Sequence, residues 1–413
     1  MNCVNRDGAD LMGALAGIRV IDLTSVVMGP YATQILGEMG ADVIKVEPLE
    51  GDVVRNIGPA RHAGMGALFL NANRNKRSLC IDLKRAEGRD AVLRLASNAD
   101  VFVSNIRPNA LRRLELDDDV LARANPRLIR VNLTGFGQSG PYAARPAYDD
   151  LIQGASGLAA LSAQASGAEA RYAPLALADR VAGLFAANAI SAALFERAGS
   201  GLGQSIEVPM FETMASFVLA DHAGGLSFTP PLNDGGYQRL LTRDRRPFKT
   251  ADGHICAIIY TDQHWRSFLA EIGMEDLPAR DPRFANFASR AAHVDAVYSF
   301  VAEILATRTS TEWLERLGQV SVPVAPMHNL RSLTDDPHLA AVDFFESAEH
   351  PSEGALQITA PPVRWSRTPA ANTRHAPILG EHSAEILTEA GFVSDAIAAL
   401  ISAGIVQTAI APC

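Results

Sequence analysis

Short apolar runs and amphipathic stretches alternate along the first part of the chain. Residues 18–23 (IRVIDL) and 41–46 (ADVIKV) are short and rich in branched side chains, which predicts two buried strands. Between them, Gly29 and Pro30 predict the start of a helix and Gly40 its end, because proline suits a first helical turn and glycine the position after the last one. The same pattern predicts three more strands, at 78–83, 100–104 and 128–133, and two more helices, at 85–97 and 118–124. Strands that alternate with helices at this spacing predict parallel βαβ units in a Rossmann-like sheet.

The pattern changes in the middle of the chain. Residues 178–197 form a long alanine-rich amphipathic run, which predicts one helix that ties the sheet to the second half of the chain. Residues 222–247 are rich in Gly, Pro, Asp and Arg and predict an exposed connection. After it, the chain predicts a hairpin over 248–260 that turns at Asp252 and Gly253. The remaining expected elements are helices at 262–272, 293–306 and 309–318, a return crossing at 322–327, and two tail helices within 383–406 that join near Gly391.

These patterns predict an α/β chain with a large Rossmann-like domain and a smaller α+β domain. We expect the large domain over 1–197, a linker over 198–247 and the small domain over 248–321. Residues 322–413 are expected to form a return linker and C-terminal helices that complete the large domain.

Composition places the chain among folded globular proteins, with 48% hydrophobic and 20% charged residues in 413. The formal charge is −9, from 37 Lys and Arg against 46 Asp and Glu, which disfavours general nucleic-acid binding because duplex affinity depends on neutralised phosphates. No run approaches the roughly 18 apolar residues of a membrane span, and residues 1–15 lack the pattern of a secretion signal. The cysteines are far apart and predict neither a zinc site nor disulfides; they are Cys3, Cys80, Cys256 and Cys413. We therefore expect a cytoplasmic protein without a membrane partner.

The charge is unevenly distributed along the chain. Residues 70–146 hold 14 Lys and Arg against 8 Asp and Glu, a local charge of +6, so the remainder carries −15. A clustered cation field in an acidic protein favours a small anionic ligand at that stretch. Solvated helix faces explain the same charges without any ligand.

Familiar catalytic motifs are largely missing. The first expected strand is followed by TSVVMGP, without GxGxxG, so a nicotinamide or flavin site is not predicted. No HExxH, GxSxG or GxxxxGK[ST] sequence occurs, so neither a metal site, a serine nucleophile nor a phosphate loop is predicted. His264 is isolated, which favours a helix-surface or core role. Asp179, in PLALADRVAG at the expected start of an apolar helix, is a candidate because a helix N-terminus stabilises an anion; an N-capping aspartate explains the same pattern.

Longer motifs run along nearly the whole chain, and their order and spacing are more specific than any one of them. They are GIRVIDLTSVVMGPYATQILGEMGADVIKVEP (17–48), NANRNKRSLCIDLK (71–84), VFVSNIRPNALRRL (101–114), NPRLIRVNLTGFGQSGPYAARPAYDDLIQGASG (125–157), YAPLALADRVAG (172–183), GQSIEVPMFE (203–212), TADGHI (250–255) and GEHSAEIL (380–387). In this series the chain resembles the class III CoA-transferases. That CaiB/BaiF group includes formyl-CoA and carnitine-CoA transferases and, more distantly, 2-methylacyl-CoA racemases.

The resemblance implies an acyl-CoA:carboxylate CoA-transferase in which Asp179 is the nucleophile. Its carboxylate would form a mixed anhydride with the acyl group and then an aspartyl-CoA thioester. The substrates implied are an acyl-CoA and a carboxylic acid, with no permanently bound cofactor and no metal. The oxyanions of the reaction need donors, and the turn Gly135–Gly140 (GFGQSG) is a candidate, as it is for a purely structural turn. The family also implies an interlaced homodimer of ring-like chains.

The resemblance further implies a set of CoA contacts, most of them in the basic stretch. Lys84, Arg107 and Arg113 are the expected phosphate or adenine contacts, since Arg forks suit phosphate oxygens, and Arg74 and Lys76 are weaker candidates. The full set is Val27, Met28, Ile81, Asp82, Leu83, Lys84, Asn105, Ile106, Arg107, Arg113, Arg145, Pro146, Ala147 and Tyr148.

The chain departs from the family pattern at two places. Residues 257–265 (AIIYTDQHW) lack the glycine run that closes over the aspartate in some members, and Tyr260 and His264 are candidates to line the acyl pocket instead. Tyr148 stands near the position where the racemases carry a histidine, and tyrosine is a poor base at neutral pH. A racemase or epimerase and a non-catalytic CoA-binding subunit of a heteromeric transferase remain the alternatives.

The sequence does not identify the acids that are exchanged. Three arginines in the expected connection are candidates to pair with a second substrate carboxylate; they are Arg239, Arg243 and Arg246.

Overall fold

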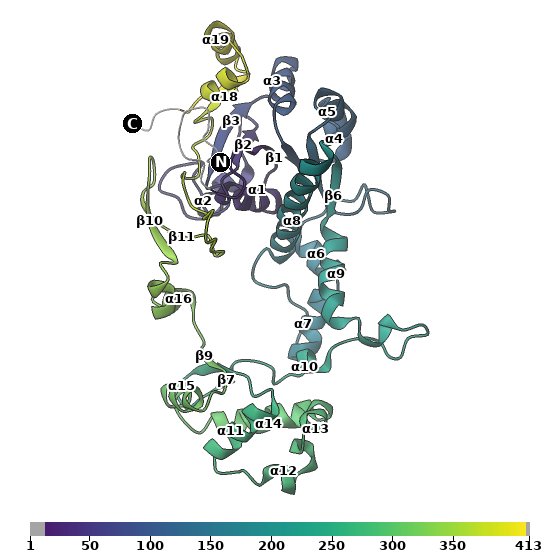
Figure 1. The fold of residues 1–413 in the computed structure, drawn as a ribbon, viewed down its shortest axis with the longest axis vertical. Helices are drawn as coiled ribbons and strands as arrows, with labels where there is room; N and C mark the ends of the chain where they lie inside the picture. The colour runs from purple at the N-terminus through teal and green to yellow at the C-terminus, as the bar shows by residue number, and fades with distance from the viewer. Residues whose placement is uncertain (1–12, 410–413) are drawn as a thin grey trace. The chain divides into compact units, whose positions relative to one another are not determined.

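The computed structural model describes residues 13–409, which divide into two units (Figure 1). Unit 1 comprises residues 13–156, 173–215 and 337–409, and unit 2 comprises 157–172 and 216–336. Unit 1 is therefore assembled from three separate stretches of the chain. Cys3 and Cys413, which entered the cysteine argument, lie outside the described residues.

Unit 1 is built on a seven-stranded sheet with the order β12-β3-β2-β1-β4-β5-β6. Neighbouring strands are parallel except β12, which runs antiparallel to β3. Ile21 stands in register with Ile44 on one side and Phe102 on the other. The strands are β1 (Arg19–Leu23), β2 (Asp42–Glu47), β3 (Lys76–Ile81), β4 (Val101–Ser104), β5 (Ile129–Thr134), β6 (Ser205–Pro209) and β12 (Val406–Gln407). This confirms the expected parallel, Rossmann-like sheet.

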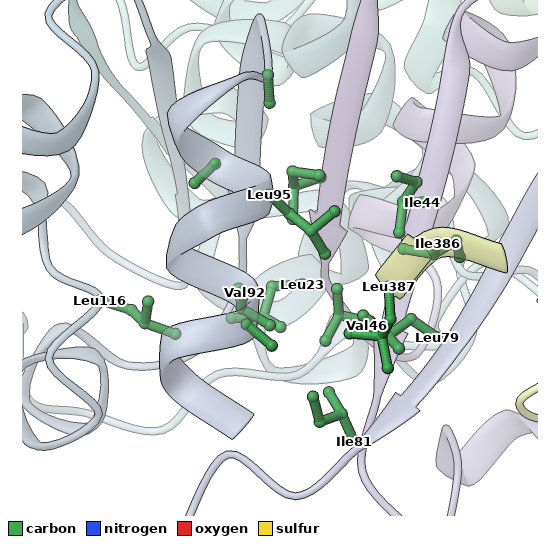
Figure 2. Close-up of a cluster of buried hydrophobic side chains, with 14 of the residues drawn as sticks. Leu23, Ile44, Val46, Leu79, Ile81, Val92, Leu95, Leu116, Ile386 and Leu387 are labelled. Atoms are coloured by element: carbon green, nitrogen blue, oxygen red, sulfur yellow. The ribbon is translucent and has the colours of Figure 1, made fainter. Parts of the chain in front are cut away.

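The helices of unit 1 bury both faces of the sheet, as a parallel sheet requires. On one face, apolar side chains of β1, β2 and β3 meet α3 and α18 in the core of Figure 2, where Leu23, Ile44 and Leu79 lie against Leu95 and Leu387. Elsewhere in the unit, α1 packs against α8. The helices are α1 (Met28–Glu38), α2 (Ala67–Leu70), α3 (Ala86–Ser97), α4 (Pro108–Arg113), α5 (Asp118–Ala124), α6 (Asp149–Ala155), α8 (Leu177–Ser200), α9 (Met210–His222, which ends in unit 2), α17 (Pro337–Ala341), α18 (Ser383–Glu389) and α19 (Ser394–Ser402), with a 3₁₀ turn at Val53–Asn56.

The long helix α8 corrects one expectation from the sequence. By length and a mean hydropathy of 1.3 it satisfies the criteria for a membrane span, although no such segment was expected. Half of that apolar window is buried inside the protein, and Ala186 and Ile190 lie in the core. Packing within unit 1 accounts for the buried half of the window.

Several strands of unit 1 were not expected. The edge strand β6 and the hairpin of β10 (Phe345–His350) and β11 (Gly354–Thr359) are half-exposed, and β6 and β10 carry charged residues, so their apolar pattern is weak. β3 starts two residues earlier than expected because Lys76 and Arg77 are buried in ion pairs rather than solvated.

Unit 2 is a small α+β unit with an antiparallel sheet in the order β7-β8-β9. The expected hairpin is confirmed as β7 (Phe248–Lys249) and β8 (His254–Ala257), but the expected return crossing is a third strand, β9 (Val324–Pro326). Trp265, Phe268 and Trp313 lie in its core. The helices are α7 (Leu158–Ser166), α10 (Gln238–Leu241), α11 (Asp262–Glu271), α12 (Leu277–Arg280), α13 (Phe287–Ala292), α14 (Val294–Leu305), α15 (Ser310–Gln319) and α16 (Leu330–Thr334), with 3₁₀ turns at Gly224–Ser227 and Pro282–Phe284.

Candidate active site

In a doubly wound fold, a crevice lies outside the carboxyl ends of the sheet strands. We call this side of the unit 1 sheet its carboxyl edge. The strand order reverses between β1 and β4, which are neighbours although they are not consecutive in the chain. In open α/β sheets, ligands bind outside the carboxyl ends of the strands at such a reversal. The segments that follow β1, β3 and β4 contain three groups of expected CoA contacts, at 27–28, 81–84 and 105–107. The fold therefore brings these groups, distant in sequence, to one edge of the sheet.

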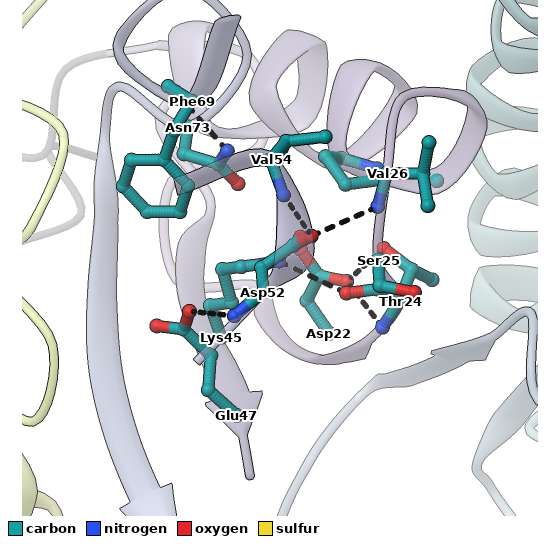
Figure 3. A network of polar contacts seen from close by, with 12 residues as sticks. Asp22, Thr24, Ser25, Val26, Lys45, Glu47, Asp52, Val54, Phe69 and Asn73 are labelled. Atoms are coloured by element: carbon teal, nitrogen blue, oxygen red, sulfur yellow. Dashed lines mark hydrogen bonds and ion pairs between the residues drawn. The ribbon is translucent and has the colours of Figure 1, made fainter. Parts of the chain in front are cut away.

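A buried ionic network lies beneath this edge (Figure 3). Lys76 Nζ contacts Asp22 Oδ2 at 3.0 Å, and both side chains are fully buried. Lys45 Nζ contacts Asp52 Oδ2 at 2.9 Å, also without solvent exposure. Burial alone would raise the pKa of Asp22, but Lys76, Lys45 and two threonine hydroxyls outweigh it and lower that pKa to about 2. These charges are compensated inside the protein.

The two weaker CoA candidates belong to such internal pairs. Lys76 also donates hydrogen bonds to Pro30 O and Asn73 Oδ1, so all three ammonium donors have partners. Arg74 is nearly buried and donates to Asn372 Oδ1, with Glu38 at 3.6 Å. Both cations have internal partners, which favours a structural role over contact with a phosphate.

Asp179 lies in the first turn of α8, as the third helical residue. Ala176 is the N-cap residue and makes no side-chain cap hydrogen bond, so the N-cap interpretation of Asp179 does not hold. The Asp179 backbone N–H donates to Asp149 Oδ1 at 3.0 Å, and Gln153 Nε2 donates to Asp149 Oδ2 at 2.6 Å. The half-buried Asp179 carboxylate is thus held by its helix beside a second carboxylate.

Gln153 fixes the segment that leads into α8. It is fully buried, and its side chain accepts from Ala173 N–H at 2.8 Å and donates to Leu175 O at 3.3 Å. The start of α8 is therefore tied to α6 through Asp149 and Gln153. Sequence reasoning did not single out these two residues, although their i, i+4 spacing at the start of a helix was a usable signal.

The environment of Asp179 raises its pKa to about 6. Burial is the main cause, the neighbouring Asp149 adds to it, and Arg180 acts in the opposite direction. The guanidinium of Arg180 lies over the Tyr31 ring, 4.4 Å from its centroid. Asp179 is therefore a carboxylate with little compensating charge, in contrast to Asp22.

Close packing of α8 on α1 brings Asp179 toward the turn after β1. Gly183 is four residues after Asp179 and so lies on the same face of α8. A Cβ added at Gly183 would stand 2.8 Å from Met28 O and 3.1 Å from the Tyr31 ring, so only glycine permits this approach. The helix face that carries Asp179 therefore packs against the N-terminal turn of α1, where Met28 is located.

The expected CoA contacts differ in exposure. Val27, Met28 and Ile81 are buried, and Asp82, Leu83, Asn105, Ile106 and Ala147 are half-buried. The exposed ones are Lys84, Arg107, Arg113, Arg145, Pro146 and Tyr148. Within residues 13–409, no ion pair involves the four exposed cations of that list, and the Arg145 guanidinium lies 3.7 Å from the centroid of the Tyr142 ring. Their charges are available to an anion.

The turn Gly135–Gly140 is occupied by internal contacts. Gly137 N–H donates to Glu212 Oε1 at 2.9 Å, and Gln138 N–H donates to Glu207 Oε1 at 2.8 Å. A Cβ at Gly135 would stand 2.2 Å from Ala147 Cβ, which explains the glycine there by packing. These two amide donors are already used, which favours the structural interpretation of this turn.

The remaining candidates lie in unit 2. Tyr260 packs edge-on against Phe287 and its N–H donates to His264 Nδ1 at 3.4 Å. Among the connection arginines, Arg239 stacks over Tyr260 and Arg246 pairs with Asp244 at 3.2 Å. The side chain of Arg243 lies against Gly167.

Comparison with known proteins agrees with this architecture. Residues 15–383 match the family model described as CoA-transferase family III. An acyl-CoA transferase of Fusarium pseudograminearum is 32% identical over 98% of this chain and 91% of its own length. A succinate–glutarate CoA-transferase of Agrobacterium fabrum is 33% identical over 91% of this chain and 95% of its own length. The crystal structure of a CaiB/BaiF family protein from Brucella suis superposes with a TM-score of 0.78, at 32% identity, over 92% of this chain and all of that one.

The doubly wound sheet together with the family match and these relatives places the protein among the α/β CoA-transferases. The chain belongs to CoA-transferase family III, the CaiB/BaiF type. Enzymes of this family use CoA thioesters as substrates.

Proposed function

We propose that this enzyme moves CoA from an acyl-CoA donor to a carboxylic acid acceptor, with Asp179 as the nucleophile. The observation that carries the proposal is the Asp179 carboxylate itself. It is half-buried, lacks a compensating ion pair among the described residues, and belongs to the α8 face that packs on α1 next to Met28. An uncompensated carboxylate beside the crevice of a doubly wound sheet suits covalent catalysis.

The proposed first half-reaction has two steps. An Asp179 oxygen attacks the thioester carbonyl carbon, the C–S bond breaks, and the CoA thiolate leaves with the electron pair. The thiolate is a competent leaving group, with a thiol pKa of about 8.5, and a mixed anhydride remains on Asp179. The thiolate then attacks the side-chain carbonyl carbon of Asp179 and expels the donor carboxylate. The aspartyl-CoA thioester that results keeps the CoA on the enzyme.

The second half-reaction is the reverse sequence with the acceptor. The acceptor carboxylate attacks the aspartyl-CoA carbonyl carbon and releases the thiolate. The thiolate then attacks the acceptor's acyl carbon and regenerates the Asp179 carboxylate. No proton is gained or lost overall, so the enzyme needs no separate general base, which suits a site whose main titratable groups are Asp179 and Asp149.

The CoA contacts form a second part of the proposal. Lys84, Arg107 and Arg113 are proposed to meet phosphates or the adenine, since they are exposed and have no ion pair within the described chain. The rest of the proposed set comprises Val27, Met28, Ile81–Leu83, Asn105, Ile106 and Arg145–Tyr148.

Substrate class, assembly and location are proposed at a coarser level. The name of the Agrobacterium relative supports a dicarboxylate as donor or acceptor. An interlaced homodimer in the cytoplasm remains our proposal, as do the domain boundaries at 197, 247 and 321. Tyr148 in place of a histidine base gives no support to a racemase.

Intact-protein mass spectrometry tests this function directly. Wild type and Asp179→Ala are incubated with a panel of acyl-CoA thioesters that includes succinyl-CoA, and each adduct is treated with hydroxylamine. We expect an adduct of CoA mass on wild type only, removed by hydroxylamine. If no donor gives an adduct while solvent deuterium enters the acyl α-carbon, the enzyme is an epimerase and the proposal is wrong.

A further inference from the structure

The three residues directly after β1, Thr24–Val26, are called the β1 turn. Its first residue is held by the buried ionic network. Thr24 N–H donates to Asp22 Oδ1 at 3.0 Å, and Lys45 Nζ donates to Thr24 O at 2.9 Å (Figure 3). Both polar backbone groups of Thr24 are therefore bonded to side chains rather than to another strand or helix.

The next two residues are held from other elements. Asn105, directly after β4, accepts from Ser25 N–H at 3.1 Å and donates through Nδ2 to Ser25 O at 2.9 Å. Asp52 Oδ1 accepts from Val26 N–H at 3.2 Å. Five successive backbone groups, from Thr24 N–H to Val26 N–H, are thus all bonded to side chains.

These bonds hold a strained backbone. Val26 has φ of +72°, the left-handed region, which a β-branched residue adopts at a clear energetic cost. Such a conformation persists only where its surroundings over-determine it, and it is commonest at functional sites. The hydrogen bonds from Asn105 and Asp52 flank Val26 on its N-terminal side and supply that constraint.

The β1 turn fixes where α1 begins. Val27 and Met28 come directly after Val26, and both are buried. A Cβ at Gly29 would stand 2.3 Å from the Thr24 side chain, so the start of α1 is packed directly on the turn. Because Gly183 of α8 packs on Met28 O, the same turn supports the helix face that carries Asp179.

We propose that Asn105 is a positioning residue of the acyl-CoA site, which clamps the β1 turn in its strained conformation and so sets Val27 and Met28 at the carboxyl edge. Oδ1 and one N–H of its side-chain amide are bonded to Ser25, so we assign its effect on the site to the turn, and its place in the proposed contact set then follows from the position of the turn. This inference rests on the proposed CoA site. It adds a role for the two hydrogen bonds that join Asn105, after β4, to Ser25, after β1.

A double-mutant cycle with Val26 separates this role from direct contact. Asn105→Ala frees Val26 to leave the left-handed region, which moves Val27 and Met28. Val26→Gly removes the strain, since glycine adopts positive φ at no steric cost. In the Asn105→Ala background it therefore restores the population of the native turn. A residue that touches CoA itself gives no such rescue.

The measurement is the Kd of CoA by isothermal titration calorimetry on the full chain, well below its Tm. We expect Asn105→Ala to weaken CoA binding about tenfold, as the loss of two net hydrogen bonds implies. Addition of Val26→Gly to Asn105→Ala is expected to recover most of that loss. Asn105→Asp keeps the acceptor for Ser25 N–H but loses the donor, and it gives a smaller loss that Val26→Gly also reduces. If Asn105→Ala does not fold, Asn105→Asp takes its place in the comparison with and without Val26→Gly.

Two further variants make the outcomes distinct. Asn125 is a matched control. It precedes β5, at the amino ends of the strands and away from the proposed site, and its side chain donates to Ala96 O and Ala99 O. Asn125→Ala is expected to lower Tm and leave the Kd of CoA unchanged. Arg107→Ala reports on the CoA site itself and is not rescued by Val26→Gly.

Each pattern of results has one meaning. If Arg107→Ala weakens binding and Asn105→Ala does not, the clamp is dispensable and the inference fails while the CoA site stands. If Asn105→Ala weakens binding without rescue by Val26→Gly, Asn105 contacts the ligand and the positioning role is overturned. If neither substitution changes the Kd, CoA binds elsewhere and the proposed site is itself wrong.

Discussion

Asp22 and Asp179 show how differently one fold treats a buried and a half-buried carboxylate. Asp22, in β1, meets Lys76 at 3.0 Å and accepts hydrogen bonds from two threonines, and its pKa falls to about 2. Asp179, at the start of α8, is affected mainly by burial and then by the negative charge of Asp149, and its pKa rises to about 6. Both stand in apolar sequence contexts. The partners that the fold supplies, and not the local sequence, separate the structural carboxylate from the one that we propose to be reactive.

The basic stretch divides in the same way. Lys76 and Arg77 are buried in ion pairs, whereas Lys84, Arg107 and Arg113 are exposed with no ion pair in residues 13–409. Local net charge alone does not tell these groups apart. A cation is available to a ligand only where the fold has left it without an internal partner.

The strongest test of this contrast is Asp179→Asn. Transfer should fall by more than about 10⁴-fold, because the nucleophile is lost, as measured by thioester exchange. Since the folded pKa lies above the unfolded one, the ionised carboxylate destabilises the fold above pH 6. The variant should therefore be more stable by about 1–2 kcal/mol at pH 8 in urea unfolding, a gain that disappears as pH falls from about 6 to 4. A loss of stability at pH 8 would make Asp179 a structural residue.

For the buried ion pair of Lys76 and Asp22, a substitution is expected to lower the stability of the fold rather than raise it. Lys76→Met leaves Asp22 without its ion-pair partner, which should cost about 3–5 kcal/mol in the free energy of unfolding. The control is Arg85→Met, which breaks an exposed contact to Glu87 at 3.4 Å and should cost under about 1 kcal/mol. If both variants unfold at the same urea concentration, the buried network does not support the fold.

Substitution of an exposed cation without an ion-pair partner is expected to have a smaller effect on the enzyme. Arg107→Ala should raise the KM for acyl-CoA by about tenfold and leave kcat nearly unchanged, since a lost charge-assisted contact to a phosphate affects ground state and transition state alike. The matched control is Arg123→Ala. Arg123 is an exposed arginine of the same basic stretch and lies in the last turn of α5, after Asp117–Asp119. Steady-state kinetics that give both variants the same KM would remove Arg107 from the site.

The smallest effect concerns the pH profile. Activity should fall as pH drops through about 6, where Asp179 gains a proton. Asp149→Asn removes the neighbouring negative charge, so the midpoint of this acid limb should move to lower pH, by less than one unit because burial is the larger cause. A profile of kcat/KM from pH 4 to 8 measures both, and a midpoint that stays in place would exclude Asp149 as a cause.

Sequence alone predicted the five strands β1 to β5 of unit 1, because they are short and rich in branched apolar side chains. It was wrong about the start of β3, since a lysine and an arginine at 76 and 77 are neutralised by partners from other elements. It was also wrong about β9, where two prolines disfavoured a strand that lies at the edge of its small sheet. Asp179 stood out by its local context, and Asp149 left a weak local signal in its i, i+4 pairing with Gln153, but the contact of Asp149 with α8 and the bonds of Asn105 to Ser25 are tertiary and have no local pattern.

The last strand of unit 1 has a consequence for how the protein is made. β12 pairs with the edge of β3, and Ile405 and Val406 join the core formed by α3 and α18. During synthesis, the edge of β3 at Cys80 and Ile81 stays unpaired until residues near 406 leave the ribosome, after all of unit 2 has emerged. An unpaired strand edge templates aggregation. The nascent chain therefore closes this edge only once residues 405–407 have been made, and a chain that stops before them would expose it.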